Sequence, residues 1–85
     1  MKNDRNRTIK FDEELDVRGL NCPLPLLRTK KTLSRMKPGE ILKVLTTDPA
    51  AEIDFRVFSA VTGNKILLLE KAEKHVIFFM MRKKK

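Results

Sequence analysis

A single cysteine, Cys22, is present in the 85-residue chain, and tryptophan and tyrosine are absent. One cysteine excludes an internal disulfide, so the chain suits a reducing compartment and carries one free thiol that needs an explanation. The five Phe residues fall in apolar patterns rather than among basic residues, which gives little support to a stacking platform for single-stranded nucleic acid. No second Cys or His stands at metal-ligand spacing from Cys22 or from His75, so we predict no metal site.

Long apolar runs are also missing from the chain. The longest, Val76 to Met81, is far too short to span a bilayer. Residues 1–7 are polar and lack the apolar segment of a secretory signal. We therefore expect a cytoplasmic protein that does not enter a membrane, and the length suits one small domain. The expected division is a basic tail over 1–8, a single domain over 9–82 and a basic tail over 83–85.

Acidic residues are fewer than basic ones, with 11 Asp and Glu against 19 Lys and Arg and a net charge of +8. The first ten residues carry a net charge of +3 and the last four a net charge of +4, so only +1 remains for everything between them. Charge runs at the ends of a chain are most often solvated segments that aid solubility. Direct binding of nucleic acid through these tails is therefore not expected.

The most informative stretch joins a predicted strand to a predicted helix and contains Cys22. Alternating apolar residues predict a strand that ends near Val17 and is interrupted by three consecutive acidic residues. Gly19 then allows a left-handed turn. Pro23 and Pro25 are tolerated only in the first turn of a helix, because proline lacks an N–H and fixes φ. The pattern therefore places Cys22 at, or next to, the N-cap of the first helix.

The rest of the chain predicts one more helix and three more strands. The first helix runs to about Met36, and the strands are expected over 41–46, 66–69 and 76–81. Asp48 is the expected N-cap of the second helix, with Pro49 at its first position and Gly63 just past its end. The apolar stripe expected to face the core from this helix is formed by Ile53, Val57, Phe58 and Val61.

The element order β-α-β-α-β-β predicts an α/β fold of the two-layer α+β sandwich type. Strands joined through a helix are normally parallel, so the first three strands should share a direction and the fourth should oppose them. The result is a four-stranded mixed sheet with two helices on one face. Cys22 and Asp48 then lie at one edge, at the carboxyl ends of parallel strands, where chemistry tends to occur. Both basic tails should lie at the opposite edge.

Three short motifs stand at intervals along the chain: Gly19-Leu20-x-Cys22-Pro23-x-Pro25, Met36-Lys37-Pro38-Gly39-Glu40 and Asp48-Pro49-Ala50. Together they resemble the small sulfur-carrier proteins of the TusA family, also called SirA-like, over roughly residues 15–69. The resemblance implies the same β-α-β-α-β-β fold and a cysteine that accepts a sulfane sulfur as a persulfide and passes it to a partner. That role would fall on Cys22, in a carrier that has no bound cofactor and is not a turnover enzyme on its own.

The resemblance also implies two protein partners. One is a sulfur donor, such as a cysteine desulfurase or a rhodanese-like enzyme, and the other is a sulfur acceptor. Leu24 stands between the prolines, where the best-known members often have Glu. The pathway therefore stays open among tRNA thiolation, molybdenum cofactor assembly, sulfur oxidation and others.

Sulfur transfer requires a thiolate at Cys22, so its pKa matters. A helix N-terminus stabilises an anion by about 0.3–1 kcal/mol, which at roughly 1.36 kcal/mol per unit lowers a pKa by up to about one unit. Arg18 and Arg28 would add to this effect, whereas Asp48 would oppose it unless its charge is used in capping. On balance, the sequence predicts a lowered pKa for the Cys22 thiol.

Three groups of candidate site residues follow. Cys22 is the catalytic residue. Motif and structural support is expected from Gly19, Pro23, Pro25, Asp48 and Pro49. Docking of a partner is expected at Arg18, Leu24, Arg28, Lys31 and Arg35, although a basic stripe on a helix is more commonly just a solvated face.

The alternative interpretation gives Cys22 no chemical role, since most lone cysteines are small buried hydrophobes. The protein would then be a small basic interaction or regulatory module, with RNA as one candidate partner. The two interpretations differ in what they require. A relay needs Cys22 and survives loss of the tails, whereas the module tolerates Cys22→Ser and fails without residues 83–85, with an affinity that falls steeply as salt rises.

Overall fold

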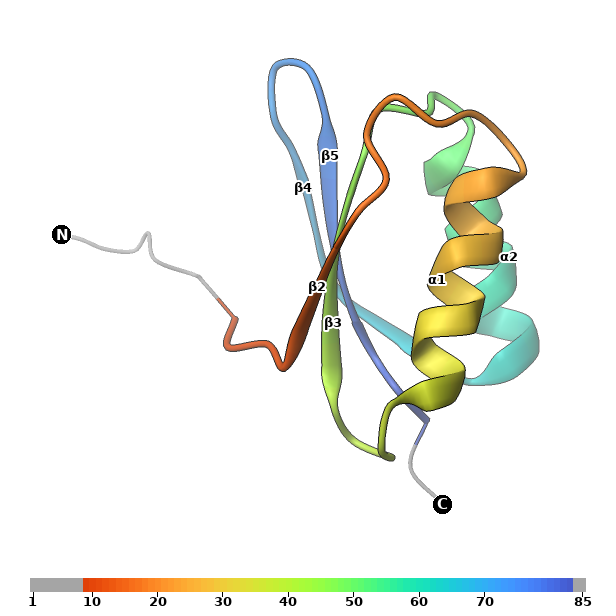
Figure 1. The fold of residues 1–85 in the computed structure, drawn as a ribbon, viewed down its shortest axis with the longest axis vertical. Helices are drawn as coiled ribbons and strands as arrows, with labels where there is room; N and C mark the ends of the chain where they lie inside the picture. The colour runs from red at the N-terminus through yellow and green to blue at the C-terminus, as the bar shows by residue number, and fades with distance from the viewer. Residues whose placement is uncertain (1–8, 84–85) are drawn as a thin grey trace, which may run out of the picture.

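The computed structural model describes residues 9–83, which form two helices and four strands in the predicted order (Figure 1). In chain order the elements are β2 (Glu13–Asp16), α1 (Leu24–Arg35), β3 (Ile41–Thr46), α2 (Ala51–Thr62), β4 (Lys65–Lys71) and β5 (Val76–Met81). Neither helix is long and apolar enough to cross a membrane. The predicted tail over 1–8, and residues 84–85 of the predicted tail over 83–85, lie outside the described residues.

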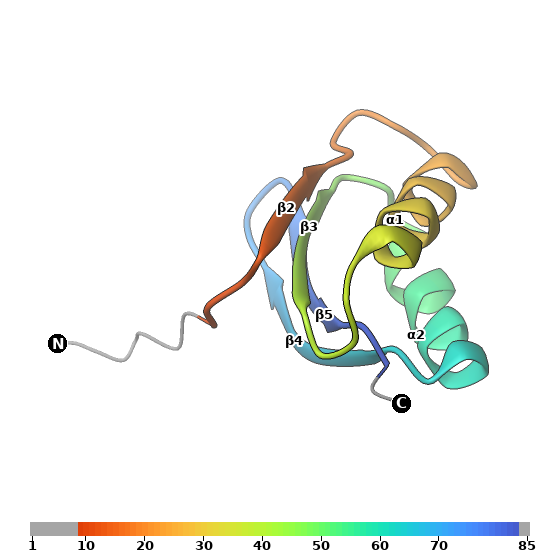
Figure 2. The same cartoon turned by 60° about the horizontal axis from the view of Figure 1, so that its bottom comes forward.

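The sheet has the strand order β2-β3-β5-β4. β2 pairs parallel with β3, and β5 pairs antiparallel with both β3 and β4. β2, β3 and β4 therefore run in one direction and β5 runs against them, as predicted. Figures 1 and 2 show both helices on the same face of this sheet, which confirms the two-layer arrangement.

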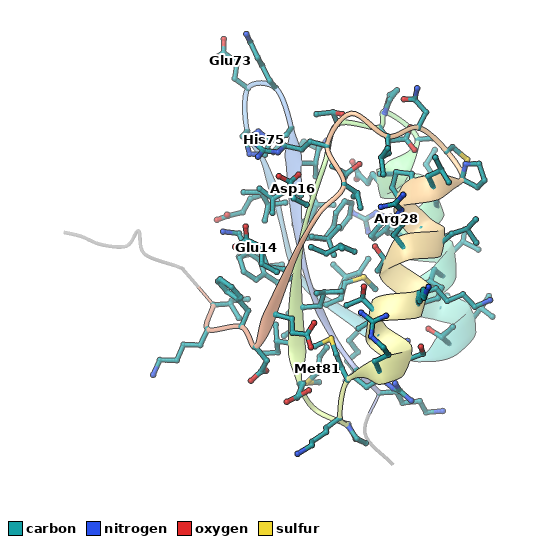
Figure 3. The ribbon with its side chains drawn as sticks, viewed as in Figure 1. Glu14, Asp16, Arg28, Glu73, His75 and Met81 are labelled. Carbon is teal, nitrogen blue, oxygen red and sulfur yellow. The ribbon has the colours of Figure 1, made fainter. Side chains whose placement is uncertain are left out.

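The first strand differs from its predicted form. The acidic residues do not interrupt it, because Glu13 and Glu14 are its first two residues and pair with Leu42 and Lys43 of β3. Just before the strand, Asp12 accepts a hydrogen bond at its side-chain Oδ2 from the Ile41 amide at 2.8 Å. β2 is an edge strand, and the face of the sheet that the helices do not cover is exposed to solvent. Acidic side chains can therefore lie on that face. Figure 3 shows Glu14 and Asp16 on that uncovered side.

The core lies between the sheet and the two helices. Phe55 of α2 stacks on Phe78 of β5 with 4.5 Å between ring centroids, and both side chains are fully buried. The other buried apolar side chains of this cluster are Val17, Leu33, Met36, Leu42, Val44, Ala51, Phe58 and Met80.

The stripe predicted to face the core from α2 is wrong for three of its four members. Ile53, Val57 and Val61 are 70%, 57% and 78% exposed, whereas Phe58 is buried. The helix instead buries Phe55 and Phe58, together with Ala51. The two sets occupy opposite sides of one helix, and the larger aromatic rings bury more apolar area, so they take the core face.

The ends of the helices depend on a few specific contacts. Gly63 closes α2 in the left-handed conformation at φ +83°, as predicted. At the other helix, Arg82 donates hydrogen bonds from one guanidinium nitrogen to the carbonyl oxygens of Leu33 and Met36. These carbonyls lie at the C-terminal end of α1, where a cation is favoured by the helix dipole. Arg82 therefore ties the end of β5 to the end of α1 that is far from Cys22.

Candidate functional site

Cys22 lies exposed in the β2–α1 loop, two residues before α1 begins. Neighbouring backbone contacts hold this loop against the end of β3. The Val17 amide donates to the Leu45 carbonyl at 2.9 Å, and the Gly19 amide donates to Oγ1 of Thr47 at 2.8 Å. Gly19 has φ +85°, which permits this turn. The β2–α1 and β3–α2 loops therefore lie side by side, as seen at the top of Figure 1.

The start of α1 agrees with the prediction. Pro23 is the N-cap residue and Pro25 falls within the first turn, so Cys22 stands next to the N-cap. Before the regular helix begins, the Leu24 amide donates to the Asn21 carbonyl at 2.9 Å. Pro25 is fully buried, whereas Leu24 between the prolines is exposed. The turn thus fixes the backbone on both sides of the thiol and leaves the sulfur at the surface.

Asp48 does not cap α2 as predicted. The helix begins at Ala51, with Ala50 as the N-cap residue, and Pro49 is exposed in the preceding loop rather than at the first helical position. Asp48 instead accepts a hydrogen bond at Oδ1 from the Ala50 amide at 3.0 Å, and only 6% of the residue is exposed. It closes a local turn that precedes the helix, a use of Asp that competes with capping.

The electrostatics around Cys22 are opposite to the prediction. The Cys22 sulfur and the carboxylates of Asp48 and Asp54 lie within 4.8 Å of one another. The interaction with the Asp54 carboxylate, desolvation and the negative charges of Asp54 and Asp48 together raise the pKa of Cys22 above its ordinary value. Two carboxylates outweigh the field of a helix N-terminus, which is worth only about 0.3–1 kcal/mol.

Arg18 does not assist the thiol, although the sequence suggested that it would. Its guanidinium donates to both carboxylate oxygens of Asp16, at 2.9 and 2.7 Å, and its backbone amide donates to the same group at 3.0 Å. These hydrogen bonds lower the pKa of Asp16 to about 2. Arg18 is therefore neutralised by a strand residue on the uncovered side of the sheet.

Three of the four basic residues of α1 form a stripe that lines a groove of about 440 Å³. Three cations, Arg28, Lys31 and Arg35, lie along it with the exposed apolar side chains of Leu24 and Leu27. Within residues 9–83 none of these three cations forms an ion pair. Figure 3 shows Arg28 on the half of α1 nearer the β2–α1 loop. The groove therefore combines positive charge and apolar surface, the composition of a docking site for an acidic partner.

Asp54 is the site residue that sequence reasoning missed. It follows Cys22 by 32 positions and belongs to α2, whereas Cys22 precedes α1, so no local motif joins the two. The spacing of Cys and His along the chain likewise gave no sign of the cluster of Cys22, Asp48 and Asp54. Oδ1 of Asp48 already accepts the Ala50 amide and the Cys22 thiol is exposed, so we interpret the cluster through proton chemistry.

Comparison with known proteins gives consistent matches over most of the chain. A model of the family described as "Sulfurtransferase TusA" matches residues 13–83. The sulfur carrier protein TusA of Allochromatium vinosum is 50% identical over 73 residues, which cover 86% of this chain and 95% of that protein. The putative sulfur carrier protein YrkI of Bacillus subtilis is 37% identical over 75 residues, covering 88% and 99%.

The fold also has a counterpart among solved structures. The crystal structure of a SirA-like protein from Desulfitobacterium hafniense matches this fold with a TM-score of 0.74 and 22% sequence identity. The match covers 86% of this chain and 100% of that chain. This likeness supports the order and layering of the elements.

Proposed function

The chain belongs to the TusA family of sulfur carriers, and we propose that Cys22 is the residue that holds the sulfur, as a persulfide. One observation carries this proposal. A sulfane sulfur is held on a protein thiol, and Cys22 is the only cysteine in the sequence and is exposed. A sulfur carrier with this sequence therefore has a single thiol to use.

The proposed cycle has two transfers. In the first, the sulfur of Cys22 attacks the outer sulfur of a donor persulfide, and the sulfur–sulfur bond of the donor breaks so that its electron pair leaves with the donor's own sulfur. In the second, an acceptor thiolate takes the same sulfur from Cys22. Gly19, Pro23 and Pro25 support this chemistry by fixing the loop, and Asp48 and Pro49 shape the adjacent loop. The exposed position of Cys22 lets the sulfur enter the active site of each partner in turn.

A sulfur carrier has a donor and an acceptor, and we propose which surface meets them. The groove beside α1 presents Arg28, Lys31 and Arg35 without ion-pair partners in residues 9–83, next to exposed Leu24. Such a surface suits an acidic patch on a donor such as a cysteine desulfurase or a rhodanese-like enzyme. Arg18, which is held by Asp16, is the weakest of the predicted docking residues. A thiol that must stay reduced suits the cytoplasm.

Sulfur loading on Cys22 is tested by intact mass spectrometry. The protein and its Cys22→Ser variant are incubated with a cysteine desulfurase and cysteine, and the masses are compared before and after reduction. The wild type should gain one sulfur atom that a reductant removes, and Cys22→Ser should gain none. Loading of the variant, or no loading of the wild type by a desulfurase or by a rhodanese with thiosulfate, would refute the assignment.

A further inference from the structure

The carboxylate of Asp54 is placed to exchange a proton with Cys22. Asp54 lies on the first turn of α2 and is partly exposed, and its carboxylate lies within 4.8 Å of the Cys22 sulfur. Within residues 9–83 it forms no ion pair that would occupy it. Asp54 belongs to α2, whereas Cys22 lies in the loop between β2 and α1. Tertiary packing therefore brings the two groups together.

We propose that Asp54 is a catalytic proton acceptor for Cys22 during sulfur transfer, an inference that rests on the proposed role of Cys22 as the sulfur-carrying residue. As the Cys22 sulfur bonds to the outer sulfur of a donor persulfide R–S–SH, its proton passes to the Asp54 carboxylate. The donor sulfur–sulfur bond breaks, and its electron pair leaves with R–S⁻, which takes the proton from Asp54. The products are Cys22–S–SH and R–SH, so atoms, charge and electrons balance without another reactant.

The other charged groups near the thiol are less suited to this role. Asp48, in the β3–α2 loop, is almost completely buried and its Oδ1 accepts the Ala50 amide. Arg18, in the β2–α1 loop, is paired with Asp16 at 2.7 Å. Arg28, on α1, lines the groove beside Leu24 and Lys31 and is not among the groups that shift the pKa of Cys22. Asp54 is therefore the accessible base at the sulfur.

The arrangement has a consequence for the free protein. Because Asp54 and Asp48 raise the pKa of Cys22, the thiol rests protonated near neutral pH and resists adventitious alkylation or oxidation. The same carboxylate then removes the proton only as the new sulfur–sulfur bond forms. A proton acceptor placed in this way commonly contributes on the order of 10²-fold or more to a rate.

The test compares two reactions of the same thiol in Asp54→Asn and the wild type. Iodoacetamide reports the thiolate fraction, and loading by glutathione persulfide, followed by intact mass, reports sulfur uptake without any docking partner. Asp54→Asn should react several-fold faster with iodoacetamide near neutral pH, yet load sulfur on the order of 10²-fold more slowly. The loading rates should converge above the pKa of the thiol, where no base is needed. Asp54→Glu should recover part of the loading rate.

A purely electrostatic role for Asp54 gives a different result, since Asp54→Asn would then speed both reactions. That outcome, or unchanged loading, would overturn the proposal. The matched control is Glu52→Gln on the same helix turn, because Glu52 pairs with Arg56 and Lys71 rather than with Cys22. Failure of the wild type itself to load would refute the role of Cys22, so the two failures are distinguishable.

A second measurement applies if Asp54→Asn does not fold, as judged by circular dichroism. In the wild-type protein labelled with ¹³C, the carboxyl resonance of Asp54 is followed as the Cys22 thiol titrates. The proposal requires the Asp54 resonance to shift at the pH at which the thiol ionises, and this shift should vanish in Cys22→Ser. An Asp54 resonance that does not respond to the thiol would contradict the contact on which the proposal rests.

Discussion

The local charge at Cys22 is negative although the chain carries a net charge of +8. Two carboxylates face the sulfur, and Arg18 is drawn away by Asp16. Free cysteines that are reactive at rest usually have cationic neighbours and a lowered pKa. Here two carboxylates raise the pKa of Cys22 instead, so the thiol stays protonated at rest. In the proposed role of Asp54, the proton leaves only when a transfer partner is present.

The pairing of Asp16 with Arg18 leads to a prediction on acid stability. The pKa of Asp16 is lowered from 3.8 to about 2 by the Arg18 hydrogen bonds. A carboxyl with a depressed folded-state pKa stabilises the fold above its unfolded pKa, and this stabilisation is lost as pH falls through the folded value. Asp16→Asn should therefore lower the free energy of unfolding near neutral pH, and the difference from wild type should shrink as pH falls and disappear below about pH 2.

Urea unfolding at a series of pH values measures this difference. Glu73→Gln, in the β4–β5 turn, is a suitable control because Glu73 forms no ion pair within residues 9–83. A difference between Asp16→Asn and wild type that stays constant down to pH 2 would contradict the assigned pairing.

Residue roles that depend on neighbours in sequence were predictable, and those that depend on tertiary contacts were not. Pro23 and Pro25 restrict their own backbone, so the helix start next to Cys22 follows from the sequence. The approach of Asp54 to Cys22 depends instead on how α2 packs beside the β2–α1 loop. The predicted help from Arg18 failed because a strand residue two positions earlier, Asp16, binds it more closely.

At the scale of elements, α2 shows how an apolar pattern alone can mislead. Its exposed side carries Ile53, Val57 and Val61, and its buried side carries Phe55 and Phe58. Both sides have apolar residues at helical spacing, so periodicity cannot choose between them. The strands over 41–46 and 76–81, in contrast, coincide with their apolar runs. Those two strands lie at the centre of the sheet, where continuous apolar runs are expected.

The two sides of α2 make a stability prediction. Phe55→Ala should lower the free energy of unfolding by about 3–5 kcal/mol, because it removes a fully buried ring stacked on Phe78. Ile53→Ala should change it by no more than about 0.5 kcal/mol, because the side chain lies in solvent. Chemical denaturation followed by circular dichroism measures both. Equal losses for the two variants, or a larger loss for Ile53→Ala, would show that the helix faces the sheet differently.

At the scale of the whole molecule, the loop that carries Cys22 and the residues that follow β5 are separated. The β2–α1 and β3–α2 loops meet at one end of the sheet, joined by the Gly19–Thr47 hydrogen bond. Arg82 and Lys83 lie at the other end, where Arg82 contacts the last turn of α1 and Lys83 donates its amide to Asn64. This polarity was predictable because a β-α-β unit places both strand ends on one edge.

The separation predicts which positive charges matter for loading by a protein donor. Reversal of charge in the groove, with Arg28→Glu and Lys31→Glu, should slow loading by a cysteine desulfurase and weaken its dependence on salt. Removal of residues 1–8 together with 84–85 should leave this rate nearly unchanged. Neither change should affect loading by glutathione persulfide, which needs no docking surface. Rates from intact mass over time, with Lys74→Glu as a charge control, provide the measurement.

The interaction-module alternative gives the opposite result. Loss of function on removal of the basic ends, together with tolerance of Cys22→Ser, would favour a salt-dependent contact with RNA or another polyanion. The docking proposal would then be wrong, since the charge that matters would lie in the tails and not beside the thiol.

The central claim is that Cys22 alone holds the transferred sulfur, and cyanolysis tests it most directly. The protein is loaded by a sulfur donor, separated from it and treated with cyanide, and the thiocyanate released is counted per chain. Because one thiol holds one sulfane sulfur, the wild type should release one equivalent and Cys22→Ser none. An equal yield from Cys22→Ser, or no thiocyanate from a wild type exposed to several donors, would contradict the account.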